Sequence, residues 1–196
     1  MKLTQSADIR VIFGNGSLDR ELVKKSLEYN RDKFCEIEIS IPESGGKGKG
    51  INVYKGIHGV IRFIKGDASR FTSSYIVFID KEHCSGDYLD CVVEVSKQYG
   101  VRIEGAEKLS ADVYKFRANT GDKDFTMYFV FQGIYCCIED LILIACGVNV
   151  DEHRGEGCCK YYKERLKNLG VEKRCESKAV TELFNLIRVV LSDIGS

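Results

Sequence analysis

Two acidic residues directly follow a continuously apolar run of the sequence, residues 75–79. They are Asp80 and Glu82, and while a strand persists, side chains two positions apart point to the same face. Paired carboxylates are hard oxygen ligands that suit Mg²⁺ or Mn²⁺. The sequence therefore predicts a magnesium or manganese site at these two residues, with His83 as a further candidate beside it. The alternative is that the charges only mark the point where a strand reaches solvent.

A glycine-rich basic stretch, residues 44–50, precedes an apolar pattern of helical spacing that begins at Ile51. Glycine lets backbone N–H groups approach an anion, and a helix N-terminus adds its dipole. The stretch is not a nucleotide-binding P-loop, because the pattern GxxxxGK[ST] is absent. The expected phosphate-binding residues are Gly16, Lys47 and Lys49, and the expected nucleic-acid-binding residues are Arg62, Lys65 and Arg70. The alternatives are a surface loop and a solvated helix face.

Nine cysteines could serve redox or metal chemistry: residues 35, 84, 91, 136, 137, 146, 158, 159 and 175. The chain has no CxxC motif, and the two residues of a CC doublet point in different directions on a strand or a helix. Because cytosolic thiols are kept reduced, we expect most of these residues to be free thiols in the core or on the surface. A zinc site of His153, Cys158 and Cys159 is the minor alternative.

A second acidic pair, Glu139 and Asp140, follows a strand that is expected to end near Gln132. Carboxylates stabilise a helix N-terminus, so the pair is expected to cap the helix that begins near residue 138. The alternative is that it supplies a further carboxylate to a site. His58 follows the apolar spacing of the helix after residue 51 and is expected in the core.

Apolar periodicity predicts the elements that position these residues. Strands are expected at residues 9–13, 35–41, 75–79, 101–103, 113–116 and 125–131, and helices are expected to begin near residues 17, 51, 86, 138 and 177. The second strand has one polar face and is expected near an edge, and the last two strands are expected to form a hairpin. Strands that alternate with helices indicate an α/β fold, a mostly parallel sheet flanked by helices, because parallel strands need a crossover.

The composition excludes several classes of protein. The 196 residues carry 29 Lys and Arg against 29 Asp and Glu, and 44% of them are hydrophobic, which argues against a disordered chain or a basic nucleic-acid-coating tail. No apolar run approaches the length of a membrane helix, and the first ten residues do not read as a secretory signal, so we expect a cytoplasmic protein. We predict one α/β domain over residues 1–145 and a C-terminal helical extension over residues 146–196.

The element order and two short motifs resemble the Toprim domain, the metal-binding module of topoisomerases, primases and small stand-alone archaeal and bacterial proteins. Residues 15–19, Asn-Gly-Ser-Leu-Asp, stand where that family has E-G-x-x-D after its first strand, and residues 80–82, Asp-Lys-Glu, stand for its D-x-D after the third. The resemblance covers residues 9–145. It implies that Asn15, Asp19, Asp80 and Glu82 occupy the catalytic positions, with Mg²⁺ or Mn²⁺ held by Asp80 and Glu82.

The resemblance also implies phosphodiester chemistry on a nucleic acid. In the family, the glutamate of the first motif is the expected general acid or base, and Asn15 in its place carries no ionisable proton. We therefore expect a degenerate metal site in a protein that binds nucleic acid or a phosphate ligand, with weak or lost nuclease-type activity. The alternative is a non-catalytic protein-interaction or nucleotide-binding module on the same fold. The oligomeric state stays open.

Overall fold

A six-stranded sheet forms the centre of the molecule in this computed structural model, which describes residues 9–14, 17–29, 39–40, 56–68, 74–121, 123–154, 157–169 and 176–195. The strand order is β2-β1-β3-β6-β5-β4. The strands are β1 (Ile9–Phe13), β2 (Ile39–Ser40), β3 (Ser74–Asp80), β4 (Arg102–Ser110), β5 (Val113–Asn119) and β6 (Asp124–Gln132). The prediction that the second strand lies near an edge is confirmed.

The sheet is mixed, whereas the sequence predicts a mostly parallel one. The neighbours from β2 through β1 and β3 to β6 pair in parallel, but β6 with β5 and β5 with β4 pair antiparallel. The β5–β6 hairpin is as predicted. The difference arises at β4, which extends to Ser110 and returns into β5 through a turn at Ala111 and Asp112, so that no helix separates these two strands.

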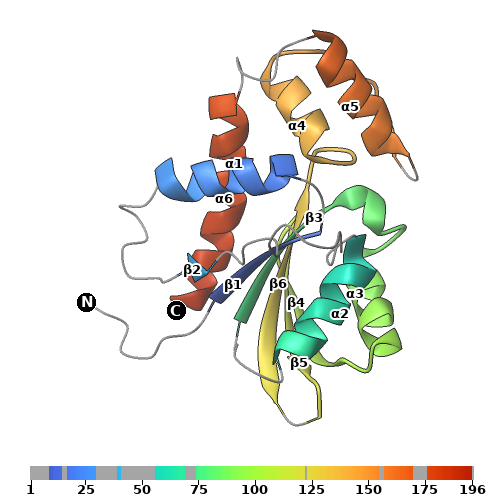
Figure 1. Cartoon of the computed structure of the whole chain (residues 1–196), viewed down its shortest axis with the longest axis vertical. Helices are drawn as coiled ribbons and strands as arrows, with labels where there is room; N and C mark the ends of the chain where they lie inside the picture. Colours follow the sequence, from blue (N-terminus) through green and yellow to red (C-terminus); the bar gives the residue numbers. More distant parts are fainter. Residues whose placement is uncertain are drawn as a thin grey trace, which may run out of the picture.

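Helices cover both faces of the sheet (Figure 1), as the sequence predicts. On one face lie α1 (Ser17–Tyr29) and α6 (Glu176–Ile194), and on the other lie α2 (Gly56–Ala68) and α3 (Tyr88–Gln98). The short helix α4 (Ile138–Ala145) and α5 (Cys158–Leu169) lie beyond the end of the sheet where β3 and β6 finish. The boundary between residues 145 and 146 stays a prediction.

Each face of β3 contributes to a different apolar core. Ile76 and Phe78 pack in the core that includes α4, α5 and α6, while Tyr75 and Val77 pack in the core that includes α2 and α3. This arrangement explains the uninterrupted apolar run of β3, because a strand that is covered on both faces has no solvent side. Asp80 continues the series of Ile76 and Phe78 and therefore faces α4 and α5.

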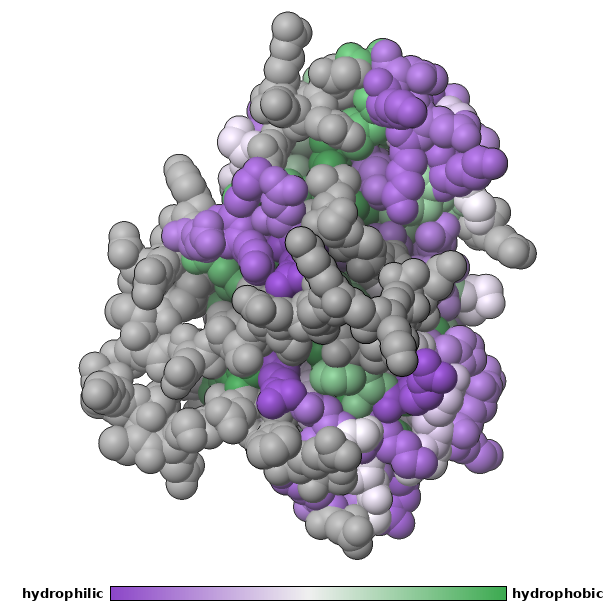
Figure 2. All heavy atoms as spheres, in the orientation of Figure 1, coloured by the Kyte–Doolittle hydropathy of each residue, from purple (hydrophilic) through white to green (hydrophobic). Residues whose placement is uncertain are grey.

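The surface is hydrophilic over the outer sides of α5, α2 and α3 (Figure 2). The inner residues of α5 are apolar or sulfur-containing and buried, namely Cys158, Cys159, Tyr162 and Leu166. The buried Tyr162 hydroxyl donates to Asp151 O at 2.8 Å and accepts from His153 N at 2.8 Å, which fixes α5 to the segment before it. Among the described helices, none is long and apolar enough to cross a bilayer.

Helix α6 is held to the sheet by a partly buried polar contact near its C-terminal end. The Asp193 carboxylate accepts hydrogen bonds from the Tyr128 hydroxyl at 2.8 Å and from Lys115 Nζ at 2.7 Å. Burial by itself would raise the pKa of Asp193, but the hydrogen bonds from Lys115 and Tyr128 outweigh burial and lower it. Burial, and after it the hydrogen bond to Asp193, raises the pKa of Tyr128. The Tyr128 hydroxyl therefore keeps its proton and stays a donor.

We expect Asp193→Asn to lower the free energy of unfolding by about 1–2 kcal/mol at neutral pH, since it removes a charge-assisted hydrogen bond. Because the folded-state pKa is depressed, this contribution is complete above the unfolded pKa of about 3.9 and is lost as the pH falls through the folded pKa. The difference between parent and variant should therefore shrink below about pH 4, as measured by urea unfolding at several pH values. Glu182→Gln, at an exposed position of the same helix, is the control. A difference that stays constant down to pH 2.5 would contradict the assignment.

Candidate metal centre

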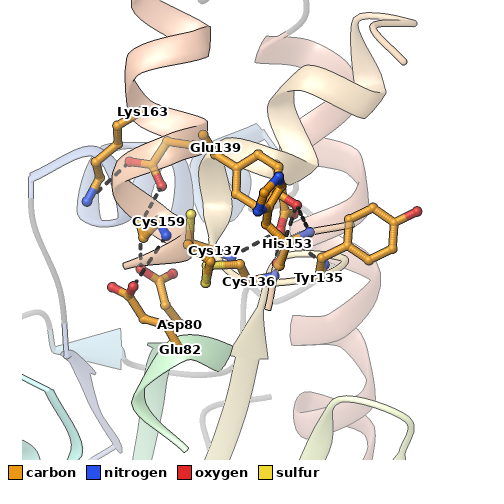
Figure 3. Close-up of a disulfide and its surroundings, with 12 residues drawn as sticks. Asp80, Glu82, Tyr135, Cys136, Cys137, Glu139, His153, Cys159 and Lys163 are labelled. Atoms are coloured by element: carbon orange, nitrogen blue, oxygen red, sulfur yellow. Dashed lines mark hydrogen bonds and ion pairs between the residues drawn. A yellow bond between two sulfur atoms is a disulfide. The ribbon is translucent and has the colours of Figure 1, made fainter. Parts of the chain in front are cut away.

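Four buried side chains with metal-ligating atoms meet at the end of β3 (Figure 3). Asp80 comes from the end of β3, Cys137 and Glu139 come from the start of α4, and Cys159 comes from the start of α5. One ligand atom of each of the four lies within 4.8 Å of the others. We call these four residues the inner cluster.

Two separations within the inner cluster are close to those between the ligands of a tetrahedral zinc ion. Cys159 Sγ lies 3.7 Å from Asp80 Oδ2 and 3.4 Å from Glu139 Oε2. Ligand atoms at zinc-like distances on two corners of a tetrahedron are about 3.5 Å apart. Asp80 Oδ1 accepts a hydrogen bond from Ile138 N at 3.3 Å, which orients the carboxylate toward α4.

A second group of ligand atoms lies beside the first. Glu82, Cys136 and Cys158 also place one ligand atom each within 4.8 Å of one another. Here the two sulfur atoms are joined, so that Cys136 and Cys158 form a disulfide between the starts of α4 and α5, with Cα atoms 6.2 Å apart. Glu82 lies in the short 3₁₀ turn η2 (Lys81–His83), and its Oε2 accepts from Cys159 N at 3.4 Å. We call these three residues the outer group.

The loop that presents Cys136 and Cys137 is organised around one carboxylate. Asp140 is fully buried and accepts hydrogen bonds from the four successive backbone N–H groups of residues 134–137, at 2.7, 3.0, 2.6 and 3.2 Å. Gly133 opens the loop with a φ of 93°, a left-handed conformation that side chains other than glycine rarely adopt. The loop is also tied to η2, because Glu82 N donates to Cys136 O at 3.2 Å and Lys81 Nζ donates to Ile134 O at 3.1 Å.

The two thiols of the inner cluster hold their protons more tightly than free cysteines do. The pKa of Cys137 is raised mainly by the hydrogen bond between its sulfur and that of Cys159, and further by burial. The same hydrogen bond favours the Cys159 thiolate, but burial and the carboxylates of Glu139 and Asp80 outweigh it and raise the pKa of Cys159. Lys163 Nζ lies 3.5 Å from Glu139 Oε1 at the exposed edge of the cluster. Burial opposes a charge on Lys163, yet the nearby Glu139 carboxylate wins and raises the pKa of this lysine.

A buried amide next to the inner cluster lacks a partner within the described residues. Gln132 ends β6 and is directly in register with Asp80, so the two side chains lie on the same face of the sheet. Gln132 is 0% exposed, and neither its Oε1 nor its Nε2 has a hydrogen-bond partner among the described side chains and backbone groups. Buried polar groups are normally satisfied, and an orphaned pair of atoms is typical of a place where a ligand or a water is bound.

The cysteines depart from the sequence prediction of free thiols. The structure pairs Cys136 with Cys158 and also Cys84 with Cys91, whose Cα atoms are 5.7 Å apart. Among the described cysteines, Cys137 and Cys159 are free and buried. The prediction was wrong because it rested on the redox state of the cytosol, whereas pairing depends on which cysteines the fold brings together. Adjacent residues do point apart, as expected, but each half of one doublet meets its counterpart from the other.

The other candidate ligands have mixed outcomes. Asp140 caps α4 as the sequence predicts, while Glu139 takes the alternative role and supplies a carboxylate to the inner cluster. His153 is not a ligand of either group; its ring lies 4.1 Å from the ring of Tyr161, so the His153–Cys158–Cys159 zinc site is wrong. Asp80 belongs to the inner cluster and Glu82 to the outer group, because the strand ends at Asp80 and η2 turns Glu82 away from the strand direction.

Several predicted site residues cannot be placed with the cluster. Asn15, Gly16, Lys47, Lys49 and Arg70 lie outside the described residues, and Asp19 lies in α1 with its side chain outside the described part. Arg62 and Lys65 are exposed on α2 and belong to neither ligand group. Their expected contact with nucleic acid stays a prediction.

The two histidines near η2 line a separate cleft. His58 is exposed, contrary to the expectation of a core residue, because the buried face of α2 is formed by Ile57, Val60 and Ile61 instead. His58 and the half-buried His83 line a cleft of about 360 Å³ together with acidic residues of the α3 region, Asp87, Asp90 and Glu94. The acidic lining does not favour a phosphate ligand there.

Sequence reasoning missed Cys137 and Gln132 as site residues, and it named Cys159 only in the minor zinc alternative with His153 and Cys158. Each cysteine doublet stands at the start of a helix, and the first is followed by a carboxylate two residues later, in Cys-Cys-Ile-Glu. Two doublets of this kind, one of them next to an acidic residue, are the signal that could have pointed to a shared site. Gln132 offered no signal, since its lack of a partner exists only in the folded molecule.

The fold and the site together define a class: an α/β protein with a mixed sheet and a buried cysteine–carboxylate cluster at the carboxyl end of a central strand. Comparison of the chain with models of protein families, with curated proteins and with solved structures found no match. The resemblance to Toprim domains therefore stays a prediction.

Proposed function

We propose that this protein is a non-catalytic binding module that carries a structural zinc ion in the inner cluster, with Asp80, Cys137, Glu139 and Cys159 as ligands. One observation carries the proposal: four buried side chains from three separate elements bring one ligand atom each to within 4.8 Å of the others. A metal ion would stabilise such a group of buried carboxylates and thiolates, because burial disfavours charges that no counter-ion balances.

The ligand types favour zinc over the magnesium or manganese that the acidic pair alone predicts. Two of the four ligands are cysteine sulfurs, and thiolates select Zn²⁺ and other soft cations. Mg²⁺ prefers six oxygen ligands and keeps several waters, which a buried site does not accommodate. Structural zinc sites use four protein ligands in a tetrahedron, and the inner cluster offers four.

The burial of Asp80 favours the non-catalytic alternative over nuclease-type activity. A metal that acts on a phosphodiester needs an open coordination position that the substrate can reach. Asp80 is 1% exposed, and the cluster to which it belongs is completed by residues of α4 and α5. The ion would instead tie β3 to both helices, and its binding energy would then stabilise the docking of the C-terminal part of the chain.

Zinc binding by the full chain tests this function. The metal-stripped protein, purified without reductant so that its disulfides persist, should bind one Zn²⁺ per chain in competition with a chromophoric chelator. Co²⁺ in its place should give the intense absorption of a tetrahedral thiolate site. The double variant Cys137→Ser/Cys159→Ser should weaken zinc binding by more than the roughly 10–100-fold that the loss of an outer partner costs.

The matched control is Cys84→Ser/Cys91→Ser, which removes the same number of sulfur atoms from a disulfide outside the cluster and should leave zinc binding unchanged. Equal zinc affinity in the parent and in Cys137→Ser/Cys159→Ser would contradict the ligand assignment. Binding of Mg²⁺ or Mn²⁺ that survives in this variant, with no zinc binding by the parent, would restore the oxygen-only site that the sequence predicts.

A further inference from the structure

The inner cluster and the outer group are built from the same three segments. The end of β3 and η2 supply Asp80 to the inner cluster and Glu82 to the outer group. The loop before α4 supplies Cys137 to the first and Cys136 to the second, and the start of α5 likewise supplies Cys159 and Cys158. Each segment thus places at least one ligand in each group, and the start of α4 adds Glu139 to the inner cluster. Figure 3 shows Glu82 and Cys136 next to the side chains of the inner cluster.

We propose that the outer group is a second zinc site, formed by Glu82, Cys136 and Cys158, and that the Cys136–Cys158 disulfide keeps it closed until the bond is reduced. This inference deepens the proposed function, since it adds a redox-controlled ion beside the structural one. In the oxidised chain, two of the three ligands are bonded to each other and cannot bind a metal. Reduction frees both sulfurs within reach of the same carboxylate.

The positions of the three residues require little rearrangement for metal binding. The Cα atoms of Cys136 and Cys158 are 6.2 Å apart. Thiolate sulfurs at two corners of a zinc tetrahedron lie about 3.8 Å apart, which cysteines at this backbone separation reach by rotation of their side chains. Glu82 is held nearby because its backbone N–H donates to Cys136 O at 3.2 Å and its Oε2 accepts from Cys159 N at 3.4 Å.

The second site differs from the first in its access to solvent. All four residues of the inner cluster are buried, whereas Glu82 is half-buried. With three protein ligands, the fourth position of a tetrahedral zinc ion falls to a water or to a ligand with a basic oxygen, nitrogen or sulfur atom. The reduced protein would therefore hold one zinc ion with four protein ligands and a second zinc ion with one exchangeable ligand.

The chemistry balances with a dithiol as the reductant. Thiol–disulfide exchange breaks the Cys136–Cys158 bond, gives each cysteine a thiol and converts the dithiol to its cyclic disulfide. Zinc then binds the two sulfurs as thiolates, and their two protons pass to solvent. Reoxidation by a disulfide of low molecular weight reverses both steps and releases the ion.

The zinc content of the full chain before and after reduction tests the inference. Cys84→Ser/Cys91→Ser/Cys146→Ser serves as the parent, because these three cysteines are disulfide-bonded outside the site and their thiols could take up zinc after reduction. A phosphine is the reductant, and it becomes the phosphine oxide with oxygen from water. Bound zinc, measured by elemental analysis after gel filtration, should double on reduction, from one ion to two. Adding Glu82→Gln should weaken the second ion about tenfold or more and leave the first unchanged.

The variant that also carries Cys136→Ser/Cys158→Ser should hold one ion with or without the phosphine. A reduced chain that stays folded by circular dichroism and holds the same amount of zinc as the oxidised one would overturn the second site. A reduced chain that unfolds would also overturn it, because a site that opens on reduction cannot depend on the disulfide. Failure of the proposed function looks different: the oxidised chain would hold no zinc at all, whatever reduction then adds.

Discussion

Replacing Asp140 with alanine should lower the free energy of unfolding by about 4 kcal/mol, because it leaves four backbone N–H groups without their acceptor in the core. Each lost acceptor costs up to about 1–3 kcal/mol, and water that enters the vacated space recovers part of the sum. The same carboxylate holds the loop that presents Cys136 and Cys137. Zinc affinity should therefore fall about tenfold or more even where the variant is still folded. Urea unfolding and the chelator competition measure the two effects.

Asp90 provides the matched control for this experiment. It occupies the third residue of α3, as Asp140 does in α4, but its side chain is exposed. Asp90→Ala should cost no more than about 0.5–1 kcal/mol, the usual range for a carboxylate at an exposed helix N-terminus. Asp140→Asn keeps the side-chain volume and one acceptor oxygen. Its cost in unfolding free energy should therefore lie between those of Asp140→Ala and Asp90→Ala. If Asp140→Ala and Asp90→Ala have equal effects, the four hydrogen bonds do not organise the loop.

Replacing Gly133 with alanine should cost about 3 kcal/mol or more, for two reasons that add together. At its φ of 93°, any L side chain is strained, which costs about 1–2 kcal/mol. In addition, the new Cβ would lie 2.4 Å from Cys137 N and 2.5 Å from Cys137 O, so the backbone of the cysteine loop must move. Backbone atoms cannot swing aside as a flexible side chain does. The change in unfolding free energy, from urea denaturation, measures the sum.

Gly121→Ala separates the two contributions. Gly121 has nearly the same conformation, with a φ of 94°, but a Cβ there meets no heavy atom of the described residues within 4 Å. This variant should show the conformational strain alone, about 1–2 kcal/mol. The excess for Gly133→Ala then reports the close approach of Gly133 to Cys137. An equal loss of unfolding free energy at the two positions would mean that the cysteine loop moves away from the new Cβ at no energetic cost.

Much of the fold follows from local patterns in the sequence. The apolar run at 75–79 became β3, the helical spacing after residue 86 became α3, and the β5–β6 hairpin formed as predicted. These elements are decided by interactions between near neighbours in the chain and by the need to bury one or both faces. The long β4 was underestimated because its residues alternate without a strong apolar face. Five of its nine residues are exposed and the other four are half-buried, as expected at the edge of a sheet.

One residue of the inner cluster was predicted from the sequence as a magnesium or manganese ligand, namely Asp80. Asp80 was identified because a carboxylate at the end of a buried strand stands out in the sequence. Its grouping with Cys137 and Cys159 was not predicted, because these cysteines are 57 and 79 residues away and reach Asp80 only when α4 and α5 dock on the sheet. The chemistry changed with them: an oxygen-only pair suits magnesium, whereas two sulfurs and two carboxylates suit zinc.

The sequence by itself determined the layered α/β architecture, the buried central strand and the acidic residue that ends it. Apolar periodicity and turn residues depend on a few neighbouring positions, so they can be recognised from the sequence alone. Only the tertiary structure decided which cysteines pair, which stay free, that Glu139 turns inward and that Gln132 has no hydrogen-bond partner among the described residues. These features depend on where α4 and α5 pack against the end of β3. That placement results from many weak contacts between distant segments, which no local pattern in the chain encodes.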